Sequence, residues 1–258
     1  MEIITSTSNQ IARYVRSLGA KKARDASRTF IVEGQKFVDE IGDPSQIELV
    51  VASQSFVVAN DLAKYSGIQL HIASDRVFAS ISDVQQPQGV LAVVQQREYA
   101  INDMLRAKTP LVLLLEDIQD PGNLGTILRI AHGLGACGIV LSPGCADIYN
   151  PKVVRSSAGS IFHVPFAVSS LHNAVAKLKS HGLRIFAAKA EAEHALHQLD
   201  FQPPTAFIIG NEARGLSDEI AVLADDGVCI PIKSESLNAS VACGILVYEA
   251  ARQRNFLG

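Results

Sequence analysis

Three short segments of the chain carry polar side chains that can bind or orient a ligand. The first segment holds an amide and a guanidinium, the second a carboxylate, and the third two hydroxyls with an amide. In chain order these residues are Asn123, Arg129, Glu212, Ser236, Asn238 and Ser240. Amides, hydroxyls and carboxylates position a ligand through hydrogen bonds, and a guanidinium can hold an anionic group. Each segment follows an apolar run. The arrangement of these runs in the fold therefore decides whether the polar side chains lie close together.

The first segment opens with a proline–glycine pair. Pro121 and Gly122 predict a turn after the apolar run 111–115, and Asn123 then stands where a helix N-cap belongs. Arg129 lies further along the same short helix, among apolar neighbours. Taken alone, Arg129 is explained equally well as one partner of a surface ion pair.

The second segment joins an apolar run to the next helix through two glycines. The run 206–209 leads into Gly210, then Glu212, then Gly215. We expect Gly210 to let a ligand approach the backbone at the strand end, and Gly215 to permit a tight turn. A purely structural connection between a strand and a helix is the alternative.

The third segment leads into the last helix of the chain. Pro231 has no N–H to donate to a β-ladder, so the strand expected over 228–232 lies at an edge or ends there. The polar residues of this segment stand at the head of a helix that continues to about Arg252. A well-capped helix accounts for one of these polar residues and leaves the others for a different role.

The second part of the chain alternates apolar runs with stretches of helical period, a pattern of the α/β class. The expected strands are 111–115, 138–141, 184–187, 206–209 and 228–232. Fully apolar strands separated by helices predict a parallel sheet that helices cover on both faces. Ligands bind to such sheets in the loops beyond the carboxyl ends of the strands, where the polar segments lie.

The first part of the chain is expected to form a smaller α/β domain. Its expected strands are 48–52, 69–72 and 90–94, and its expected helices are 9–18, 35–41 and 76–81. After Val94 the chain turns polar and charged. We therefore expect a domain over residues 1–95, a linker over 96–109 and a second domain over 110–258.

Composition limits the class of protein. Hydrophobic residues make up 48% of the 258 residues and charged residues 19%, which is enough apolar material for a buried core. The chain shows no signal-peptide pattern, no apolar run long enough to span a bilayer, and no metal-binding pattern among its four cysteines. These features predict a cytoplasmic protein with reduced thiols and no membrane segment.

The net charge of −3 hides a basic amino-terminal end. Residues 1–36 contain seven Lys or Arg and three acidic residues, so they carry a local charge of +4 and the remainder sums to −7. A phosphate-contacting segment needs such an excess of positive charge, although a solvated helix and loop explain it as well.

Two further patterns are better explained without a ligand. Residues 133–138 match GxGxxG, but they end a helix and lead into a strand, whereas a dinucleotide site needs its glycines between a strand and a helix. We interpret Gly135 and Gly138 as helix-ending and turn glycines. His194 and His197 lie in a segment that reads as an exposed acidic helix, and their spacing without further ligands is a weak metal pattern.

The three polar segments together, in this order and at these strand ends, closely resemble the three motifs of the SpoU (TrmH-type) RNA 2′-O-ribose methyltransferases of the SPOUT superfamily. The resemblance covers roughly Leu111 to Arg254, and residues 150–160 are also similar to the family's sequence between its first two motifs. It implies a parallel-sheet α/β/α domain with a deep trefoil knot, and a homodimer. Composition and periodicity do not predict a knot, which ordinary chains avoid.

The resemblance also implies methyl transfer from S-adenosylmethionine to a ribose 2′-hydroxyl of RNA, without a metal. Arg129 matches the family's catalytic arginine and either acts as a base once desolvated or orients and stabilises the alkoxide. The residues that would position Arg129 and the ribose are Asn123, Glu212, Ser236 and Asn238. The cofactor site is assigned to Gly210, Ile230, Leu237, Leu141, Ile232 and Ser240.

Residues 1–95 are similar to the small substrate-binding domain that many ribosomal-RNA members carry, and the segment 28–34 matches its opening. The residues expected to contact RNA phosphates are Arg13, Arg16, Lys21, Lys22, Arg24, Arg28 and Arg155. Ribosomal RNA is therefore the expected substrate. The alternatives are a tRNA methyltransferase, an antibiotic-resistance methylase, a non-catalytic RNA-binding or ribosome-assembly factor, and a nucleotide-dependent oxidoreductase, which the misplaced glycine pattern disfavours.

Overall fold

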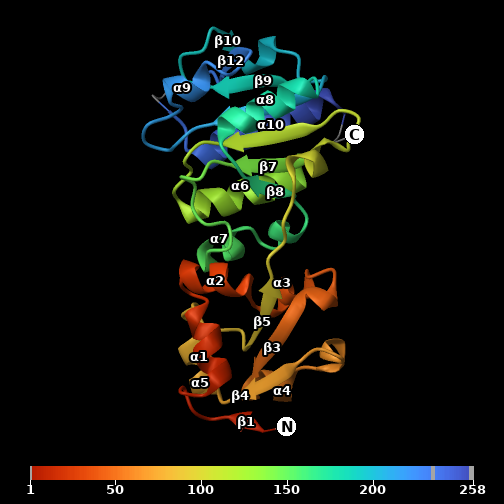
Figure 1. Ribbon diagram of the computed structural model, residues 1–258, viewed down its shortest axis with the longest axis vertical. Coiled ribbons are helices and arrows are strands. Elements are labelled where there is room, and N and C mark those ends of the chain that lie inside the picture. The colour runs from red at the N-terminus through yellow and green to blue at the C-terminus, as the bar shows by residue number, and fades with distance from the viewer. Residues whose placement is uncertain (1, 234–235, 256–258) are drawn as a thin grey trace. The chain divides into compact units, whose positions relative to one another are not determined.

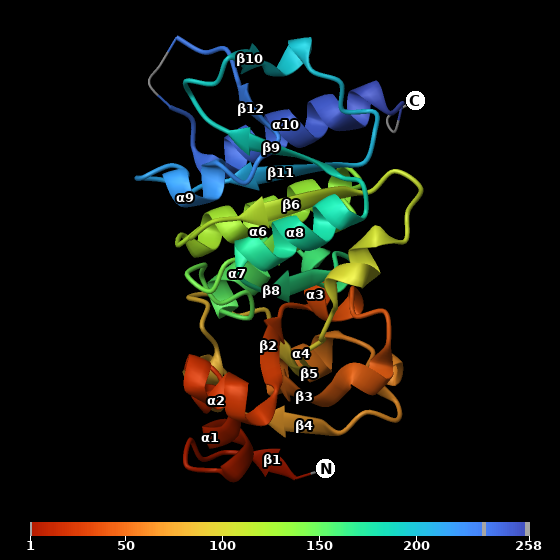
Figure 2. The same ribbon diagram turned by 45° about the horizontal axis from the view of Figure 1, so that its top comes forward.

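The computed structural model describes residues 2–233 and 236–255 of the chain. The chain forms two compact units, each with its own β-sheet (Figure 1), and Figure 2 shows the same elements from a second direction. Unit 1 comprises Met1–Arg97 and Asp147–Phe162, and unit 2 comprises Glu98–Ala146 and His163–Gly258. The amino-terminal unit therefore includes a short segment from the middle of the chain.

Unit 1 is built on a five-stranded mixed sheet with the order β1-β4-β3-β5-β2. Its strands are β1 (Ile3–Ile4), β2 (Thr29–Glu33), β3 (Ile47–Ser53), β4 (Leu70–Ala73) and β5 (Val90–Gln95). β4 is parallel to β1 and β3, whereas β5 is antiparallel to β2 and β3. The strands that the sequence predicts in this part of the chain are confirmed as β3, β4 and β5, and β1 and β2 add to them.

Helices cover the sheet of unit 1. They are α1 (Gln10–Ser17), α2 (Lys21–Ser27), α3 (Gln35–Asp39), α4 (Gln54–Ala59), α5 (Asp75–Ile81) and α7 (Pro151–Ser156), with 3₁₀ turns η1 (Pro44–Gln46), η2 (Ala63–Tyr65) and η4 (Ser160–Phe162). Val15 of α1 and Phe78 of α5 pack against Val51 and Leu91 on one face. The predicted helices are confirmed as α1, α3 and α5.

The segment Asp147–Phe162 is held in unit 1 by ring contacts and a buried ion pair. The ring of Tyr149 lies 4.7 Å from the ring of Phe30 in β2. Arg24 of α2 is 2% exposed and its Nη2 lies 2.5 Å from Asp147 Oδ2. The boundaries expected from the sequence place this segment in the second domain, because the residues that hold it in unit 1 lie far away in the sequence.

The stretch that the sequence analysis treats as a linker, 96–109, contains an element of unit 2. The 3₁₀ helix η3 (Ile101–Leu105) places Met104, which is 1% exposed, in the core of that unit. A side chain at Gly138 would overlap Met104, so this glycine is required by the packing of η3. Part of the expected linker is therefore folded into unit 2.

Unit 2 is built on a seven-stranded sheet with the order β10-β12-β9-β11-β6-β7-β8, in which every neighbouring pair is parallel. Its strands are β6 (Leu111–Leu115), β7 (Gly138–Leu141), β8 (Phe166–Val168), β9 (Arg184–Ala188), β10 (His194–Ala195), β11 (Thr205–Ile209) and β12 (Asp226–Cys229). All the predicted strands are present. β12 ends before Pro231, as expected of a residue that cannot donate to a ladder.

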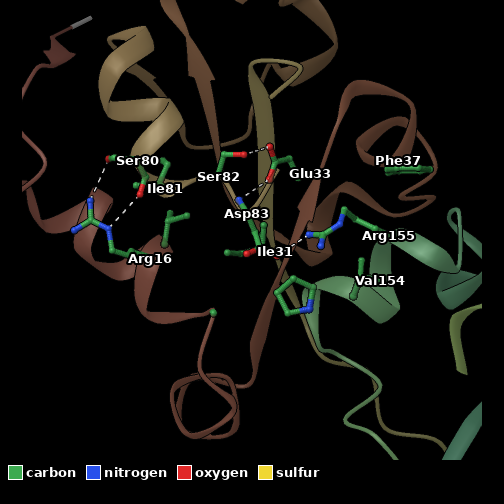
Figure 3. Close-up of a pocket in the computed structure, with 13 residues that line it drawn as sticks. Arg16, Ile31, Glu33, Phe37, Ser80, Ile81, Ser82, Asp83, Val154 and Arg155 are labelled. Atoms are coloured by element: carbon green, nitrogen blue, oxygen red, sulfur yellow. Dashed lines mark hydrogen bonds and ion pairs between the residues drawn. The ribbon is translucent and has the colours of Figure 1, made fainter. Parts of the chain in front are cut away.

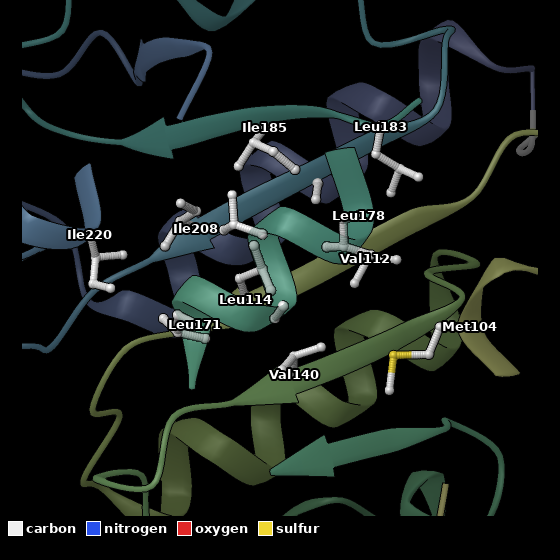
Figure 4. Packing of buried hydrophobic residues seen from close by; sticks show 13 residues of the cluster. Met104, Val112, Leu114, Val140, Leu171, Leu178, Leu183, Ile185, Ile208 and Ile220 are labelled. Carbon is white, nitrogen blue, oxygen red and sulfur yellow. The ribbon is translucent and has the colours of Figure 1, made fainter. Parts of the chain in front are cut away.

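Helices cover both faces of this sheet, as predicted. They are α6 (Pro121–Gly133), α8 (Leu171–Ser180), α9 (Asp218–Ala221) and α10 (Ala239–Gln253). Figure 4 shows α8 over one face, where Val175 and Leu178 pack against Leu114 and Ile208. α6 and α10 lie on the opposite face, onto which the alternate strand residues such as Leu113, 0% exposed, project.

Of the predictions for the segment around His194 and for Gly135, one is wrong and one is confirmed. The segment around His194 is not a helix, and that prediction was wrong. Instead, β10 pairs with β12, and the 3₁₀ turn η5 (Leu196–Gln198) follows it. His194 Nδ1 lies 3.1 Å from Asp226 Oδ1, so strand pairing and a tertiary contact overrode the local acidic pattern. The helix-ending role of Gly135 is confirmed by its φ of +74° directly after α6.

Candidate active site

The three polar segments lie at one edge of the sheet of unit 2. β6, β11, β9 and β12 are neighbouring parallel strands, so their carboxyl ends share that edge. α6 follows β6, the segment 210–217 follows β11, and the segment 230–238 follows β12. The strand order therefore brings residues from distant parts of the chain to the same place.

Side chains from all three segments are joined by hydrogen bonds. Asn123 Nδ2 donates to Glu212 Oε1 at 2.9 Å, and Asn238 Nδ2 donates to Asn123 Oδ1 at 3.0 Å. Ser240 Oγ lies 3.3 Å from Asn123 Oδ1. Asn123 is therefore the centre of a hydrogen-bonded group whose members come from three separate motifs of the sequence.

Asp120, not Asn123, caps the first helix. α6 begins at Pro121, and the side chain of Asp120 accepts a hydrogen bond from Asn123 N at 2.8 Å. The prediction that Asn123 is the N-cap was wrong, because a proline is favoured at the first helical position and sets the helix start. The side chain of Asn123 is thereby used to contact Glu212 and Asn238 instead.

Asn238 has two functions at the start of α10. Its Oδ1 accepts hydrogen bonds from Ser240 N at 2.9 Å and Val241 N at 3.3 Å, which makes it the N-cap. Its Nδ2 at the same time donates to Asn123. Ser236 is exposed in the loop before this cap, and residues 234 and 235 of the third motif lie outside the described residues. α10 ends at Gln253, next to the expected Arg252.

Arg129 projects into solvent from the exposed side of α6, which also carries Thr126 and His132. Its neighbours Ile127 and Leu128 are 0% exposed, whereas Arg129 itself is exposed. Among the residues that the structure describes, Arg129 makes no hydrogen bond or ion pair. The surface ion pair considered above therefore does not form within that part of the chain, and the guanidinium is available to a ligand.

The glycines after β11 are required by the turn. Asn211 and Gly215 form an antiparallel bridge, with N···O distances of 2.9 and 3.1 Å. A side chain at Gly210 would overlap the backbone of Gly215 and Leu216. The packing of the turn therefore requires a glycine at position 210, and the approach of a ligand to its backbone stays a prediction. The φ of +68° at Gly215 confirms the tight turn.

Hydrogen bonds to Glu116 and Asp117, which were not among the expected site residues, hold the second segment against the first. Glu116 Oε2 accepts a hydrogen bond from Ser217 N at 2.9 Å, and Asn211 Nδ2 donates to Asp117 O at 2.8 Å. Asp117 has a φ of +53°, which is rare for a residue with a side chain. The signal in the sequence is a pair of acidic residues directly after an apolar strand, which without the strand order reads as an ordinary loop.

The residues assigned to the cofactor lie in two places. Ile230, Ile232 and Leu237 belong to the segment between β12 and α10, where Ile232 is 39% exposed and the other two are half-buried. Partly exposed apolar side chains at strand ends are suited to cover a flat ring such as adenine. Leu141 does not join them, because it ends β7, is 1% exposed, and is separated from β11 by β6. The loop that begins at Lys189 after β9, which the sequence analysis did not consider, shares their edge.

Comparison with known proteins decides the family. The sequence profile of the SpoU rRNA Methylase family matches residues 110–248, more than half of the chain. The chain belongs to the SpoU family. A second profile, the MRM3-like substrate binding domain, matches residues 9–92. The resemblance drawn from the motifs is thus confirmed, and so is the smaller domain before them.

Two relatives match along nearly the whole chain, and a third matches only part of it. The 23S rRNA (guanosine(2553)-2′-O)-methyltransferase RlmP of Bacillus subtilis is 32% identical over 251 residues, which are 96% of this chain and 98% of RlmP. The crystal structure of the AdoMet-bound rRNA methyltransferase from Sinorhizobium meliloti has a TM-score of 0.87 at 30% identity and covers 97% of both chains. The A. aeolicus TrmH/SpoU tRNA modifying enzyme has a TM-score of 0.51 at 25% identity, over 61% of this chain and 82% of that chain. The predicted α/β fold with a smaller first domain is confirmed.

One residue expected to contact RNA is buried. Arg24 is 2% exposed, and besides its ion pair with Asp147 it donates from Nη1 to Leu18 O at 2.7 Å and Gly19 O at 2.8 Å. Its assignment as an RNA contact is therefore corrected. The local sequence is uniformly basic, and only the packing of α2 singles out this arginine as structural.

The other basic residues assigned to RNA lie where solvent reaches them. Those that are exposed are Arg13, Arg16, Lys21, Lys22 and Arg28. Lys21 pairs with Asp25 at 2.8 Å, as neighbours one helical turn apart often do. Arg155 of α7 is half-buried and its Nη1 lies 2.8 Å from Asp83 Oδ2.

The described residues contain no cluster of three or more His, Cys, Asp or Glu side chains that could hold a metal ion. Within the same part of the chain, no helix has the length and apolar character that a membrane span needs. The cysteines, Cys137, Cys145, Cys229 and Cys243, are free thiols. Burial raises the pKa of Cys145 and Cys243 above the ordinary value, which lowers their reactivity as thiolates.

Proposed function

We propose that the chain transfers a methyl group from S-adenosylmethionine to a ribose 2′-hydroxyl of RNA, and that its substrate is ribosomal RNA. The observation that carries this proposal is the hydrogen-bonded chain Glu212–Asn123–Asn238, which joins the three family motifs on the helix that also carries Arg129. The full-length likeness to enzymes named as rRNA methyltransferases supports the choice of RNA.

The protein has to orient a ribose hydroxyl and remove its proton. S-adenosylmethionine, when bound, supplies an electrophilic methyl group on a positively charged sulfur. A ribose hydroxyl is a poor nucleophile near neutral pH, so its proton must leave as the new O–C bond forms and the C–S bond breaks. Asn123 and Asn238 hold each other and Glu212 in place, and the exposed Glu212 and Ser236 would contact the ribose.

Arg129 orients the hydroxyl and stabilises the developing negative charge in this proposal. A guanidinium in water keeps its proton at any pH at which proteins function. Arg129 is exposed and makes no ion pair among the described residues, so it can donate several hydrogen bonds to the ribose oxygen and a neighbouring phosphate. Its exposure favours this electrostatic role over that of a base, and the proton passes to water or a substrate phosphate.

The cofactor would be held by the loops after β9, β11 and β12. Main-chain groups at Gly210 and Ile230 would hydrogen-bond the adenine, while the side chains of Ile232 and Leu237 would cover its faces. These apolar side chains are partly exposed at the strand ends, as a ring-binding site requires. Ser240, which contacts Asn123, would link this site to the ribose site.

We further propose that unit 2 carries the trefoil knot of its family, and that the protein is a cytoplasmic homodimer. Val241 and Tyr248 of α10 are 49% and 52% exposed, and such apolar side chains on one helix support a subunit contact there. The free cysteines fit a reducing compartment.

Ribosomal RNA is preferred over tRNA because of unit 1. The match to the MRM3-like substrate binding domain over residues 9–92 supports RNA binding by this part of the chain, whereas the likeness to the tRNA modifying enzyme extends over only 61% of the chain. We propose that residues 1–95, with the exposed basic side chains of α1 and α2, supply affinity for the RNA backbone.

Mapping of 2′-O-methylation in ribosomal RNA and tRNA from cells with and without the protein tests the proposal. We expect one ribosomal-RNA ribose to lose its methyl group, and to regain it with the wild-type protein but not with Arg129→Ala. Loss of a tRNA methylation instead would establish the tRNA alternative. An assembly defect that Arg129→Ala rescues, with all methylations intact, would establish a non-catalytic factor.

A further inference from the structure

Unit 1 contains a cavity that the proposed reaction does not use. The cavity has a volume of about 120 Å³ and lies between α1, β2, the end of α5 and α7 (Figure 3). All of its lining residues belong to unit 1. A dry cavity of roughly 150 Å³ binds a benzene ring. This cavity is smaller than that, so it can take up one edge of a nucleic-acid base but not a whole purine.

The walls of the cavity suit the faces of such a ring. Val15 of α1, Ile31 of β2 and Val154 of α7 line it, and the aromatic ring of Phe37 lies at one side (Figure 3). Val15 is 0% and Val154 5% exposed, so the packing of their own helices fixes these side chains. Unpaired nucleic-acid bases are commonly recognised by apolar and aromatic surfaces of this kind.

Glu33 supplies a buried acceptor in the cavity. It is the last residue of β2 and is 8% exposed. Its carboxylate accepts hydrogen bonds from Ser82 Oγ at 2.5 Å and from Asp83 N at 3.4 Å, both uncharged donors. A carboxylate accepts about four hydrogen bonds in all. Acceptor positions therefore remain for the N–H groups of a ligand.

Two arginines of the cavity are held in place by neighbouring residues. Arg16 of α1 donates to Ser80 Oγ at 3.1 Å and to Ser80 O at 3.3 Å. Arg155 of α7 pairs with Asp83 at 2.8 Å. Each guanidinium has more N–H donors than these contacts use, so both can also bind a phosphate. The cavity thus combines a flat apolar space, a buried acceptor and two cations.

We propose that this cavity binds the Watson–Crick edge of one unpaired guanine of the RNA substrate, with Glu33 accepting the N1–H and N2–H hydrogen bonds and with Arg16 and Arg155 on the flanking phosphates. The proposal rests on the proposed function, because it takes RNA to be the ligand of unit 1. Guanine is the base that presents two adjacent N–H donors on its Watson–Crick edge. Adenine, cytosine and uracil each have an acceptor beside the donor on this edge. The lone pair of that acceptor would face the carboxylate and repel it, which disfavours these bases.

The test uses the full-length protein and short single-stranded RNA. Fluorescence anisotropy measures the binding of labelled uridine hexamers that carry guanine, inosine, adenine or cytosine at one central position. Inosine lacks the N2 amino group, so it offers Glu33 one N–H instead of two. We expect the guanine RNA to bind at least about fivefold more tightly than the inosine RNA, and more tightly than the other two.

Matched variants test whether the preference for guanine RNA arises from the cavity. Glu33→Gln should remove the preference for guanine over inosine, because an amide presents a donor where the carboxylate presents an acceptor. Glu48→Gln changes an exposed carboxylate of β3 outside the cavity and should keep the preference. Val154→Phe fills the cavity from α7 and should reduce binding of the guanine RNA to that of the adenine RNA. If Glu33→Gln does not fold, Val154→Phe carries the test.

Two outcomes would overturn the proposal. One is equal affinity of the wild-type protein for all four RNAs, and the other is a guanine preference that survives both Glu33→Gln and Val154→Phe. Calorimetry with S-adenosylmethionine on the same proteins measures unit 2 independently and should be unchanged in the variants. Methyl transfer is measured separately as 2′-O-methylation of RNA, so failure of the guanine site and failure of the proposed function are distinguishable.

Discussion

Asn238 donates a side-chain hydrogen bond to Asn123, 115 residues earlier in the chain, at a distance of 3.0 Å. This bond ties the start of α10 to the first turn of α6. The two helices also pack against each other, and a side-chain carbon at Gly244 would already touch Ile130 at 3.4 Å. The position of the helix that carries Arg129 therefore depends on the third motif as well as the first.

Asn123→Ala removes the centre of the hydrogen-bonded group. Glu212 and Asn238 then lose their common partner, and we expect kcat for RNA methylation to fall about 10- to 100-fold. The Kd for S-adenosylmethionine should stay within about threefold, because Asn123 contacts these loops only through Glu212, Asn238 and Ser240 and would not itself contact the cofactor. Thr126→Ala on the same helix, whose hydroxyl bonds to Gly122 O at 2.8 Å, is the control and should retain kcat. Equal losses in both variants would argue against positioning by Asn123.

Arg129→Ala should reduce methyl transfer by at least about 100-fold, because the developing charge on the ribose oxygen loses its main donor. Cofactor affinity, measured by calorimetry, should change by no more than a few-fold. Arg129→Lys keeps a charge without the planar fork and should be intermediate. The control is Arg106→Ala, which removes another exposed arginine of unit 2, one that pairs with Asp103. Normal turnover by Arg129→Ala would show that the assignment is wrong.

Arg24→Met should destabilise the protein without a direct effect on RNA contacts. Asp147 would lose its cationic partner in a largely buried place, since the side chains of this pair are 2% and 15% exposed. Breaking a buried pair typically lowers the free energy of unfolding by ~3–5 kcal/mol, and we expect the lower end because Asp147 is partly solvated. Urea unfolding measures the change. Lys22→Ala changes an exposed position and should have the opposite pattern of effects. It should weaken RNA binding and leave the free energy of unfolding unchanged.

Glu33 should make the stability of unit 1 depend on pH. Burial is the main cause of its raised pKa, so the folded state favours the protonated carboxyl. That stabilisation is present below the pKa of Glu in the unfolded chain and is lost as the pH rises through the folded pKa. Glu33→Gln cannot ionise, so its Tm should rise relative to the wild type as the pH increases above the pKa of Glu in the unfolded chain. A difference in Tm that stays constant over this range would show that Glu33 is not the group responsible.

The strands and the order of the motifs were accessible from the sequence. Leu111–Leu115 and Gly138–Leu141 were predicted to the residue, because fully apolar runs between turn residues are typical of buried parallel strands. The meeting of Glu212 with Asn123 follows once the sheet is parallel, since polar residues after neighbouring strands share an edge. The motif resemblance supplied the family.

What the sequence did not reveal depends on partners far along the chain. Arg24 looks like its basic neighbours until Asp147, 123 residues later, is placed beside it. The membership of α7 in unit 1 depends on the contact between Phe30 and Tyr149, for which no local periodicity exists. The cap of α6 was predicted wrongly for a local reason. Pro121 is favoured at the first helical position, which makes Asp120, rather than Asn123, the N-cap.

The most direct measurement is mass spectrometry of the nucleosides of ribosomal RNA that has been incubated with the purified protein and methyl-labelled S-adenosylmethionine. We predict that the label appears in a 2′-O-methylated nucleoside, and that Arg129→Ala produces none. Label on a base, or no transfer by a protein that binds the cofactor, would contradict ribose methylation at the site formed by Asn123, Glu212 and Asn238.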